Sequence, residues 1–205
     1  ARMQLAASSY GGDKAIFGYG YSAANVAITN LVSNTGVASS DVSGVGTTRR
    51  GLRGTGYGGD KAIFGYGTTG AANVSMTNLV TNVGVIGTDV TGVGTARRYL
   101  GAAGYGTDKA IFAYGYAGGS VSMSNLVSNS GVVATDVSGV GTGRQSIGAA
   151  GYGADKAIFA YGNAIGTGSV SMSNLVNSSG VIASDVTGVG TARFDLQAAG
   201  YSISA

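Results

Sequence analysis

The groups of this 205-residue chain that could do acid–base chemistry are nine aspartates, since the sequence contains no glutamate, histidine or cysteine. It therefore lacks the usual general base at neutral pH, thiolate nucleophiles and the commonest transition-metal ligands. Eight of the aspartates recur as two per repeat, in DKAIF and in DV[ST]GVGT, and only Asp195 breaks the pattern. Catalytic sites are seldom repeated fourfold, so the sequence predicts a protein that is not an enzyme. Turnover abolished by Asp195→Asn would indicate the opposite.

The repeated aspartates have a structural interpretation. The first of each pair, for example Asp108, precedes a lysine and is typical of a turn cap. The second, for example Asp136, is expected to form an ion pair with an arginine or a turn bond near GT[AG]R. A Ca²⁺ site made from equivalent carboxylates is the alternative. The glycine-rich stretches match neither phosphate-binding loop pattern, so we expect no metal and no cofactor.

Composition excludes several partners. The formal charge is +3 and only 10% of the residues are charged, which does not indicate a nucleic-acid-binding protein. No apolar run approaches the roughly 18 residues that span a bilayer, so we expect no membrane insertion. The 39 glycines favour turns and strands over helices.

A repeat of about 48 residues dominates the chain, because DKAIF recurs at Asp13, Asp60, Asp108 and Asp155. We divide a single repeat domain, residues 1–205, into units at 1–46, 47–94, 95–141 and 142–190, with 191–205 as a surplus first strand. In the third unit, four extended segments are expected at 100–106, 109–115, 120–128 and 131–137, separated by glycine- and asparagine-containing turns. Four antiparallel strands per unit predict an all-β fold, a β-propeller with four four-stranded blades of about 48 residues.

Two resemblances agree with this fold. The units resemble kelch repeats, in which a strand ending in glycines, here GYG or AYG after KAIF, follows a segment led by arginine. They are a divergent form, because the kelch pattern includes a tryptophan and this chain has none. The units are also similar to near-identical tandem repeats in uncharacterised phage and environmental proteins, which implies an extracellular or virion-associated location.

The strand count leaves the assembly open. There are five first segments, which are rich in alanine and glycine, but only four of each other kind. The surplus strand could add to an edge of a closed four-blade ring, join a second copy in a larger ring, or belong to a longer array. Closure removes exposed sheet edges and favours the first arrangement. A spare strand is also a route to a homo-oligomer through strand exchange.

Differences between the units concentrate in two places, the loops between the second and third segments and the connections that follow the repeated arginine. In an up-and-down sheet both lie on one side of the domain, which we call the variable face. A rigid scaffold with variable loops on one face is typical of a binding protein. The candidate ligand-binding residues, which combine aromatic, arginine and amide groups suited to polar ligands, are Tyr21, Arg50, Arg53, Arg98, Tyr99, Tyr116, Gln145, Asn163, Phe194 and Asp195.

These observations lead to two functional hypotheses. The first is a non-enzymatic binding module that presents the variable face to a glycan or a protein surface. The second is a purely structural repeat that joins copies by strand exchange and binds no separate ligand. In either case the aromatic stripe of Phe17, Phe64, Phe112 and Phe159 is expected to pack between neighbouring units.

Overall fold

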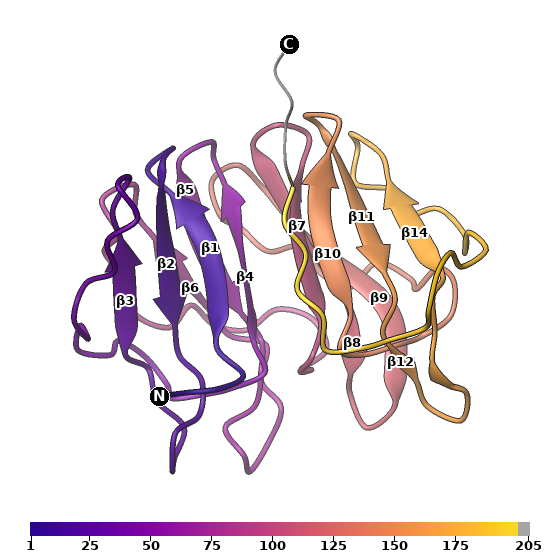
Figure 1. Ribbon diagram of the computed structural model, residues 1–205, viewed down its shortest axis with the longest axis horizontal. Helices are drawn as coiled ribbons and strands as arrows, with labels where there is room; N and C mark the ends of the chain where they lie inside the picture. Colours follow the sequence, from indigo (N-terminus) through magenta and orange to yellow (C-terminus); the bar gives the residue numbers. More distant parts are fainter. Residues whose placement is uncertain (201–205) are drawn as a thin grey trace.

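The computed structural model describes residues 1–200, in which it contains β-strands and no helix (Figure 1). Each unit forms a small antiparallel sheet of three strands in chain order. Sheet 1 comprises β1 (Ala6–Tyr10), β2 (Lys14–Gly18) and β3 (Thr29–Val32); sheet 2, β4 (Arg53–Tyr57), β5 (Lys61–Gly65) and β6 (Thr77–Val80); sheet 3, β7 (Gly101–Tyr105), β8 (Lys109–Tyr116) and β9 (Ser120–Val127); and sheet 4, β10 (Gly148–Tyr152), β11 (Lys156–Ala160) and β14 (Ser173–Val176). A short hairpin, β12 (Asn163–Ala164) with β13 (Gly168–Ser169), extends the longest variable loop.

The all-β class and the first three strands of each unit agree with the sequence prediction. In the third unit β8 and β9 lie within one residue of the expected bounds. The tyrosine–glycine pair after KAIF bends the second strand, because Tyr114 has a φ of 62° and Gly115 a φ of 111°. This bend turns the ring of Tyr114 into the protein, where it is fully buried.

The prediction of a fourth regular strand per unit is wrong. In the third unit this segment pairs with β9 at two isolated bridges, Ser124 with Val137 and Val127 with Val133, and Ala134 adds a backbone hydrogen bond to Leu126 at 2.8 Å. Between the bridges the side chain of Asn125 donates to the carbonyl of Ala134 at 3.0 Å. The side-chain amide thus supplements a few backbone hydrogen bonds where a continuous ladder would form, and the segment is an irregular edge.

The four sheets lie side by side through their first strands, in the order β1, β4, β7 and β10 (Figure 1). Small residues permit this approach: a Cβ on Gly151 would lie 3.3 Å from the carbonyl oxygen of Gly104 in the neighbouring first strand. Residues 196–200 continue the series beside β10, where a Cβ on Gly200 would lie 2.6 Å from the oxygen of Gly151. No closed barrel or propeller is evident within residues 1–200, so a four-bladed propeller is not confirmed.

The core lies between neighbouring sheets. Phe64, Phe112 and Phe159 are fully buried, and each ring packs against the bend tyrosine of the preceding sheet. The rings of Tyr66 and Phe112, for example, are 5.2 Å apart in an edge-to-face arrangement. The predicted packing of the phenylalanine stripe is confirmed for these three but is wrong for Phe17, which is 40% exposed because no sheet within residues 1–200 packs against its ring.

The part of the chain that the structure describes has no helix of the length and apolarity that crossing a membrane requires.

Candidate functional site

The repeated arginines at the connections between units are structural. Arg97 donates from Nε to the carbonyl of Tyr114 at 2.8 Å and from Nη2 to Oδ1 of Asn125 at 2.7 Å. Its Nη1 donates to the carbonyl of Thr95 at 3.0 Å, and its Cζ lies 4.3 Å from the ring centroid of Tyr66. Arg49 and Arg144 have equivalent partners and are also fully buried. Each of these guanidinium groups donates a hydrogen bond from all three of its nitrogens and joins one sheet to the next.

The second aspartate of each unit completes this junction. Asp136 lies 3.9 Å from Nη1 of Arg97 and accepts hydrogen bonds from the backbone and hydroxyl of Thr95 and from Asn125. Burial alone would raise the pKa of Asp136, but these donors outweigh it and lower the pKa below its ordinary value. The predicted aspartate–arginine pair is confirmed, and the arginine is the one that precedes the unit.

The same junction perturbs its arginine and tyrosine. Burial lowers the pKa of Arg97, partly offset by Tyr66 and Asp136. Burial also raises the pKa of Tyr66 to about 12, although Arg97 acts in the opposite direction. Such shifts can mark a catalytic site. Here they recur at Tyr114 beside Arg144, so they belong to the repeated junction.

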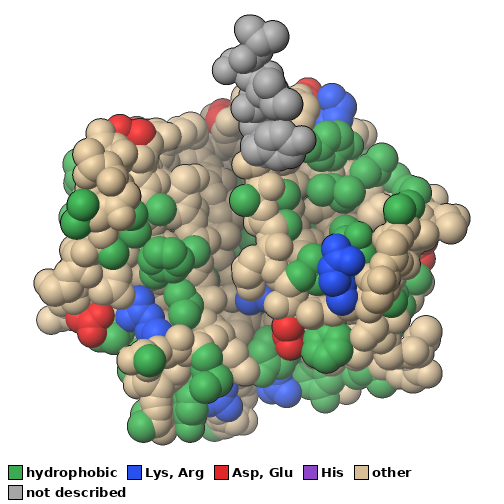
Figure 2. Space-filling view, viewed as in Figure 1, with side chains coloured by type: hydrophobic (Ala, Val, Ile, Leu, Met, Phe, Trp, Pro, Cys, Tyr) green, Lys and Arg blue, Asp and Glu red, His purple; other side chains and the backbone are tan. Residues whose placement is uncertain are grey.

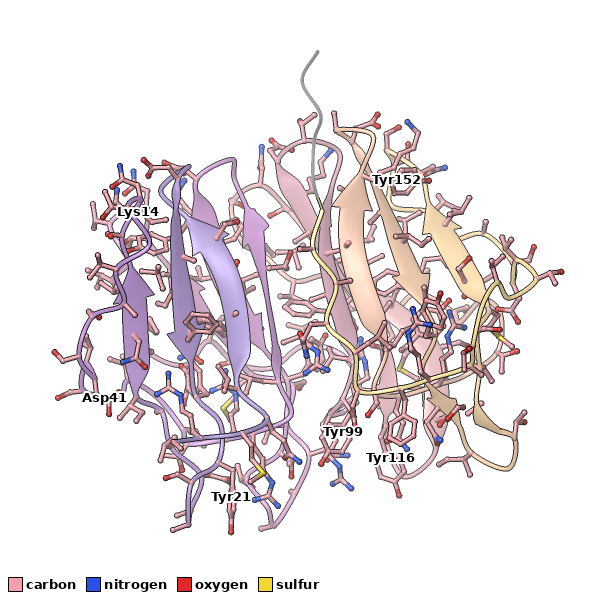
Figure 3. The ribbon with its side chains drawn as sticks, viewed as in Figure 1. Lys14, Tyr21, Asp41, Tyr99, Tyr116 and Tyr152 are labelled. Carbon is pink, nitrogen blue, oxygen red and sulfur yellow. The ribbon has the colours of Figure 1, made fainter. Side chains whose placement is uncertain are left out.

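The variable loops and the connections between units lie at one end of the sheets. Isolated bridges pair each connection with a loop: Met3 with Tyr21, Arg50 with Thr68, Arg98 with Tyr116, and Gln145 with Asn163. Figure 3 shows Tyr21, Tyr99 and Tyr116 at this end, with Lys14 and Tyr152 at the other. This agrees with the prediction that the variable loops and the connections between units share one side of the domain.

Two of the candidate arginines are held within this end. The Cζ of Arg50 lies 4.7 Å from the ring centroid of Tyr21, and its Nη1 donates to Asn25 at 3.0 Å. Arg98 likewise donates to Asn73 of the preceding loop at 3.2 Å, but it stacks on Tyr116 of the following loop, with its Cζ 4.7 Å from the ring centroid. Both guanidinium groups thus link one loop to the next connection.

Sequence reasoning missed the two asparagines. Asn25 and Asn73 occur in AANV, in the two units that are followed by a second arginine, Arg50 or Arg98. The other two units have serine in the loop and Gln145 or Phe194 after the repeated arginine. This joint occurrence of asparagine and arginine was the signal that could have identified the pairs.

The connections form a ladder around the middle of this end. The backbone N–H of Gly51 donates to Gln4, that of Tyr99 to Gly51, that of Ser146 to Tyr99, and that of Asp195 to Ser146, at 2.8 to 3.1 Å. All five residues have φ between 52° and 64°. This shared conformation leads five successive segments towards a common centre.

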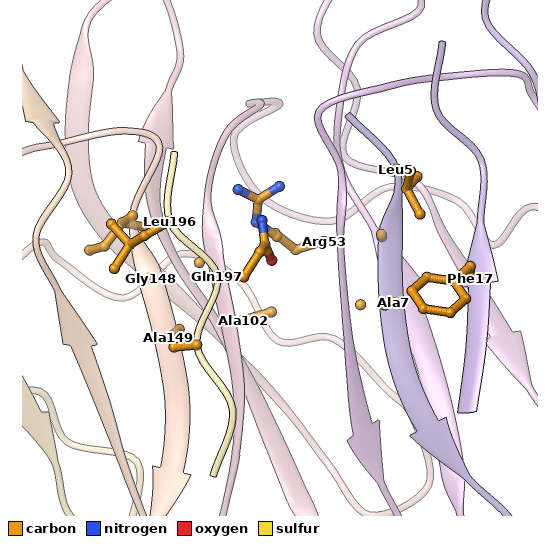
Figure 4. A pocket seen from close by; sticks show the side chains of 14 residues that line it. Leu5, Ala7, Phe17, Arg53, Ala102, Gly148, Ala149, Leu196 and Gln197 are labelled. Atoms are coloured by element: carbon orange, nitrogen blue, oxygen red, sulfur yellow. The ribbon is translucent and has the colours of Figure 1, made fainter. Parts of the chain in front are cut away.

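A cavity of about 390 Å³ lies at that centre. Most of its lining is alanine and glycine from the first strands, and Figure 4 shows Arg53 projecting between its two walls. Nη1 of Arg53 donates only to its neighbour, the carbonyl of Leu52, at 3.2 Å, within residues 1–200. Burial lowers the pKa of Arg53, and the negative charge of Asp195 offsets this in part. The half-buried guanidinium therefore keeps most of its donors free.

The lining explains a second variable position in the repeat. Arg53 is equivalent to Ala6, Gly101, Gly148 and Gln197, and all five residues line this cavity. At this position the first, third and fourth units have alanine or glycine, which leaves space in the cavity. The second unit and the last segment have the polar side chains of Arg53 and Gln197 there. Of the remaining candidates, Phe194 is 49% exposed and Asp195 is exposed beside its ladder bond.

A larger hollow of about 1080 Å³ continues from the cavity towards the other end of the first strands. The two spaces share lining residues from five successive segments, namely Ala7, Gly54, Ala102, Ala149 and Ala198. Among residues 1–200 there is no group of three or more acidic, histidine or cysteine side chains that could hold a metal ion.

Comparison with protein-family models and with curated proteins finds no match to this chain. A function for this chain must therefore be inferred from its fold and its cavity.

Proposed function

We propose that this protein is a non-enzymatic binding module, a kelch-like β-propeller scaffold that presents the variable face to a glycan or a protein surface. The sheets act as four blades whose small first strands surround the central cavity. The side-by-side order of β1, β4, β7 and β10 supports this arrangement, as does the placement of all variable loops at one end. An extracellular or virion-associated setting fits such a module.

The observation that carries the proposal is the environment of Arg53. The buried repeated arginines have backbone, amide and carboxylate partners, whereas Arg53 reaches into an open cavity with one local acceptor among residues 1–200. A guanidinium with free donors in a partly desolvated site is suited to bind a carboxylate, sulfate or phosphate group in bidentate geometry. The ligand that fits best is thus an acidic glycan or an acidic side chain of a protein surface.

The chain itself supplies the substitution that tests this. Arg53→Ala places at this position the residue that the first unit has at Ala6, so the strand should tolerate it. Binding would be measured on an array of neutral, uronic-acid, sialylated and sulfated glycans, followed by titration of the best one. We expect Arg53→Ala to weaken that binding roughly tenfold or more, the scale of a lost charge-assisted hydrogen bond.

Lys14→Ala is the matched control, because it removes the same charge at the opposite end of the sheets (Figure 3). It should leave binding unchanged. Equal losses in both variants would indicate non-specific attraction by net charge, and unchanged binding in Arg53→Ala would exclude the cavity. Circular dichroism and thermal melting would show that both variants remain folded.

A second candidate function is assembly of copies without a separate ligand. It is favoured by the surplus segment, residues 196–200, which lies beside β10 but is in no strand ladder within residues 1–200. Light scattering across a concentration range should then show self-association, and deletion of residues 194–205 should abolish it. A constant mass near 20.0 kDa would exclude this candidate.

A further inference from the structure

The three internal junctions show what covers each face of a sheet. At the junction between sheets 2 and 3, Phe112 packs on Tyr66. The turn at Gly131 covers Tyr57 and Leu79, with its Cβ position 2.9 to 3.0 Å from their side chains. The backbone N–H of Gly58 donates to the carbonyl of Asp108 at 2.6 Å. These contacts recur at the other two internal junctions.

The outer face of sheet 4 lacks these partners within residues 1–200. Tyr152 is 40% exposed, whereas the equivalent residues Tyr10, Tyr57 and Tyr105 are 4 to 5% exposed. Leu175 beside it is 39% exposed, although its equivalents are partly buried against the next sheet. At the internal junctions the equivalent face is covered by a phenylalanine, a glycine turn and an aspartate carbonyl, and within residues 1–200 sheet 4 has none of the three.

The outer face of sheet 1 offers the complementary features. Phe17 is exposed, and a Cβ on Gly36 would meet nothing within 4 Å among the described residues. At the equivalent turns, Gly84 and Gly180 lie against a leucine and a tyrosine of the preceding sheet. Sheet 1 therefore ends the series without the bend tyrosine that its own phenylalanine requires.

The environment of the last repeated arginine, Arg193, is the most specific indication that sheet 4 lacks a neighbouring sheet within residues 1–200. Arg193 already stacks on Tyr161, with its Cζ 3.9 Å from the ring centroid, and donates to the carbonyl of Thr191 at 3.0 Å. Arg97 makes the same two contacts and also binds Asn125 and Asp136 of the following sheet. Within residues 1–200 Arg193 has no asparagine or aspartate partner, so half of its junction is formed.

The two outer faces border one gap. Phe17 and Leu196 both line the central cavity, from opposite walls (Figure 4). Figure 2 shows a hollow between the part of the surface that sheet 1 forms and the part formed by sheet 4 and the last segment. Residues 196–200 already occupy the innermost position beside β10. The gap therefore lacks only the outer three segments of a sheet.

We propose that this gap is the docking site for the outer three segments of one further unit of this same repeat. Its phenylalanine would cover Tyr161, its asparagine and second aspartate would bind Arg193, and its bend tyrosine would cover Phe17. The occupant would lie beside the cavity that Arg53 enters, because Phe17 lines it too, but its binding does not require a ligand there.

The experiment uses a tryptophan as reporter, since the chain contains none. In the full chain carrying Phe17→Trp, emission should shift to shorter wavelength when a polypeptide with the sequence of residues 107–142 is added. The titration should saturate at one polypeptide per chain. Arg193→Ala in the receiving chain should weaken this binding roughly tenfold or more.

The matched control polypeptide carries Phe112→Ala and Asn125→Ala, which remove the two side chains that the free face of sheet 4 requires. It should leave the emission of the reporter tryptophan unchanged. Because a polypeptide of this length could fail to fold alone, a second version joins residues 107–142 directly after residue 202 of the reporter chain. The same emission shift and a higher melting temperature are expected there.

Two outcomes would overturn the proposal. The first is a reporter tryptophan that stays exposed with both the added and the joined segment, which would show that the gap does not accept a further unit. The second is a reporter chain that buries its tryptophan by itself while its mass doubles, since a second copy would then be the occupant. Loss of glycan binding in Arg53→Ala affects neither outcome, so the two proposals can fail separately.

Discussion

The repeated arginines 49, 97 and 144 and the non-repeated arginines 50, 53 and 98 lie within a few residues of one another but have different environments. Each repeated one is fully buried, stacks on a tyrosine, donates to asparagine and backbone acceptors, and has an aspartate oxygen 3.6 to 3.9 Å from its Nη1. Of the non-repeated set, Arg50 and Arg98 link loops, and Arg53 enters a cavity where, among residues 1–200, its donors are largely free. From this comparison we infer that repeated residues build the scaffold, and that Arg53, which is present in one unit alone, belongs to the proposed site.

The largest expected difference between the two kinds of arginine is in the free energy of unfolding lost when one of each kind is replaced by alanine. Arg97→Ala should lower the free energy of unfolding by about 3–5 kcal/mol, because it leaves the buried acceptors of Asn125 and Tyr114 unpaired. Arg98→Ala, one residue further on, should cost only about 1 kcal/mol, since its partners are half-buried and reach water. Urea unfolding followed by circular dichroism measures both. Equal losses would show that repetition does not separate scaffold from site.

A smaller effect distinguishes internal junctions from the outer faces. Phe112→Leu should cost about 1–2 kcal/mol, because leucine loses the edge-to-face contact with Tyr66 and fills less of a closed site. Phe17→Leu makes the same change where the ring is 40% exposed, and should cost less than about 0.5 kcal/mol. The melting temperatures of the two variants test this. A large loss at Phe17 would mean that a partner covers it in solution.

Much of each sheet could be predicted from the sequence, because its signals are local. The run KAIF is bounded by a glycine turn and a tyrosine–glycine bend, and β8 begins at Lys109 as expected. The fourth segment could not be predicted as irregular, because Asn125 reaches across from another strand to supplement a few backbone hydrogen bonds. Ring closure also escapes local reasoning, since it depends on the angle between sheets.

The candidate site was predictable only in part, for the same reason. The alternation of up and down strands places all variable loops at one end, which needs no three-dimensional information. Three candidates, Arg98, Tyr99 and Tyr116, do come together there. That Arg53 projects into a cavity depends on the convergence of five segments separated along the whole chain, which no local pattern encodes.

The smallest expected effect is a change in the pH dependence of stability, which comes from the aspartates at the junctions between sheets. The pKa values of Asp89, Asp136 and Asp185 are lowered from 3.8 in the folded protein, because hydrogen bonds from threonine and asparagine and the charge of the arginine outweigh burial. Near pH 4 the unfolded chain thus binds more protons than the folded one. The stabilisation is present above the unfolded pKa, near 4, and is lost as pH falls through the folded value.

Asp136→Asn should therefore lower the urea concentration at the unfolding midpoint modestly at about pH 7. Between about pH 5 and pH 2 the midpoint of this variant should decrease less steeply than that of the unmodified protein. Asp41→Asn is the matched control, because Asp41 is the equivalent residue of sheet 1 but its side chain is 65% exposed and lies 4.0 Å from Arg2. Its pH profile should follow that of the unmodified protein. If Asp41→Asn flattened the profile as much as Asp136→Asn, the acid sensitivity would arise from surface charge, and the junctions would not be its source.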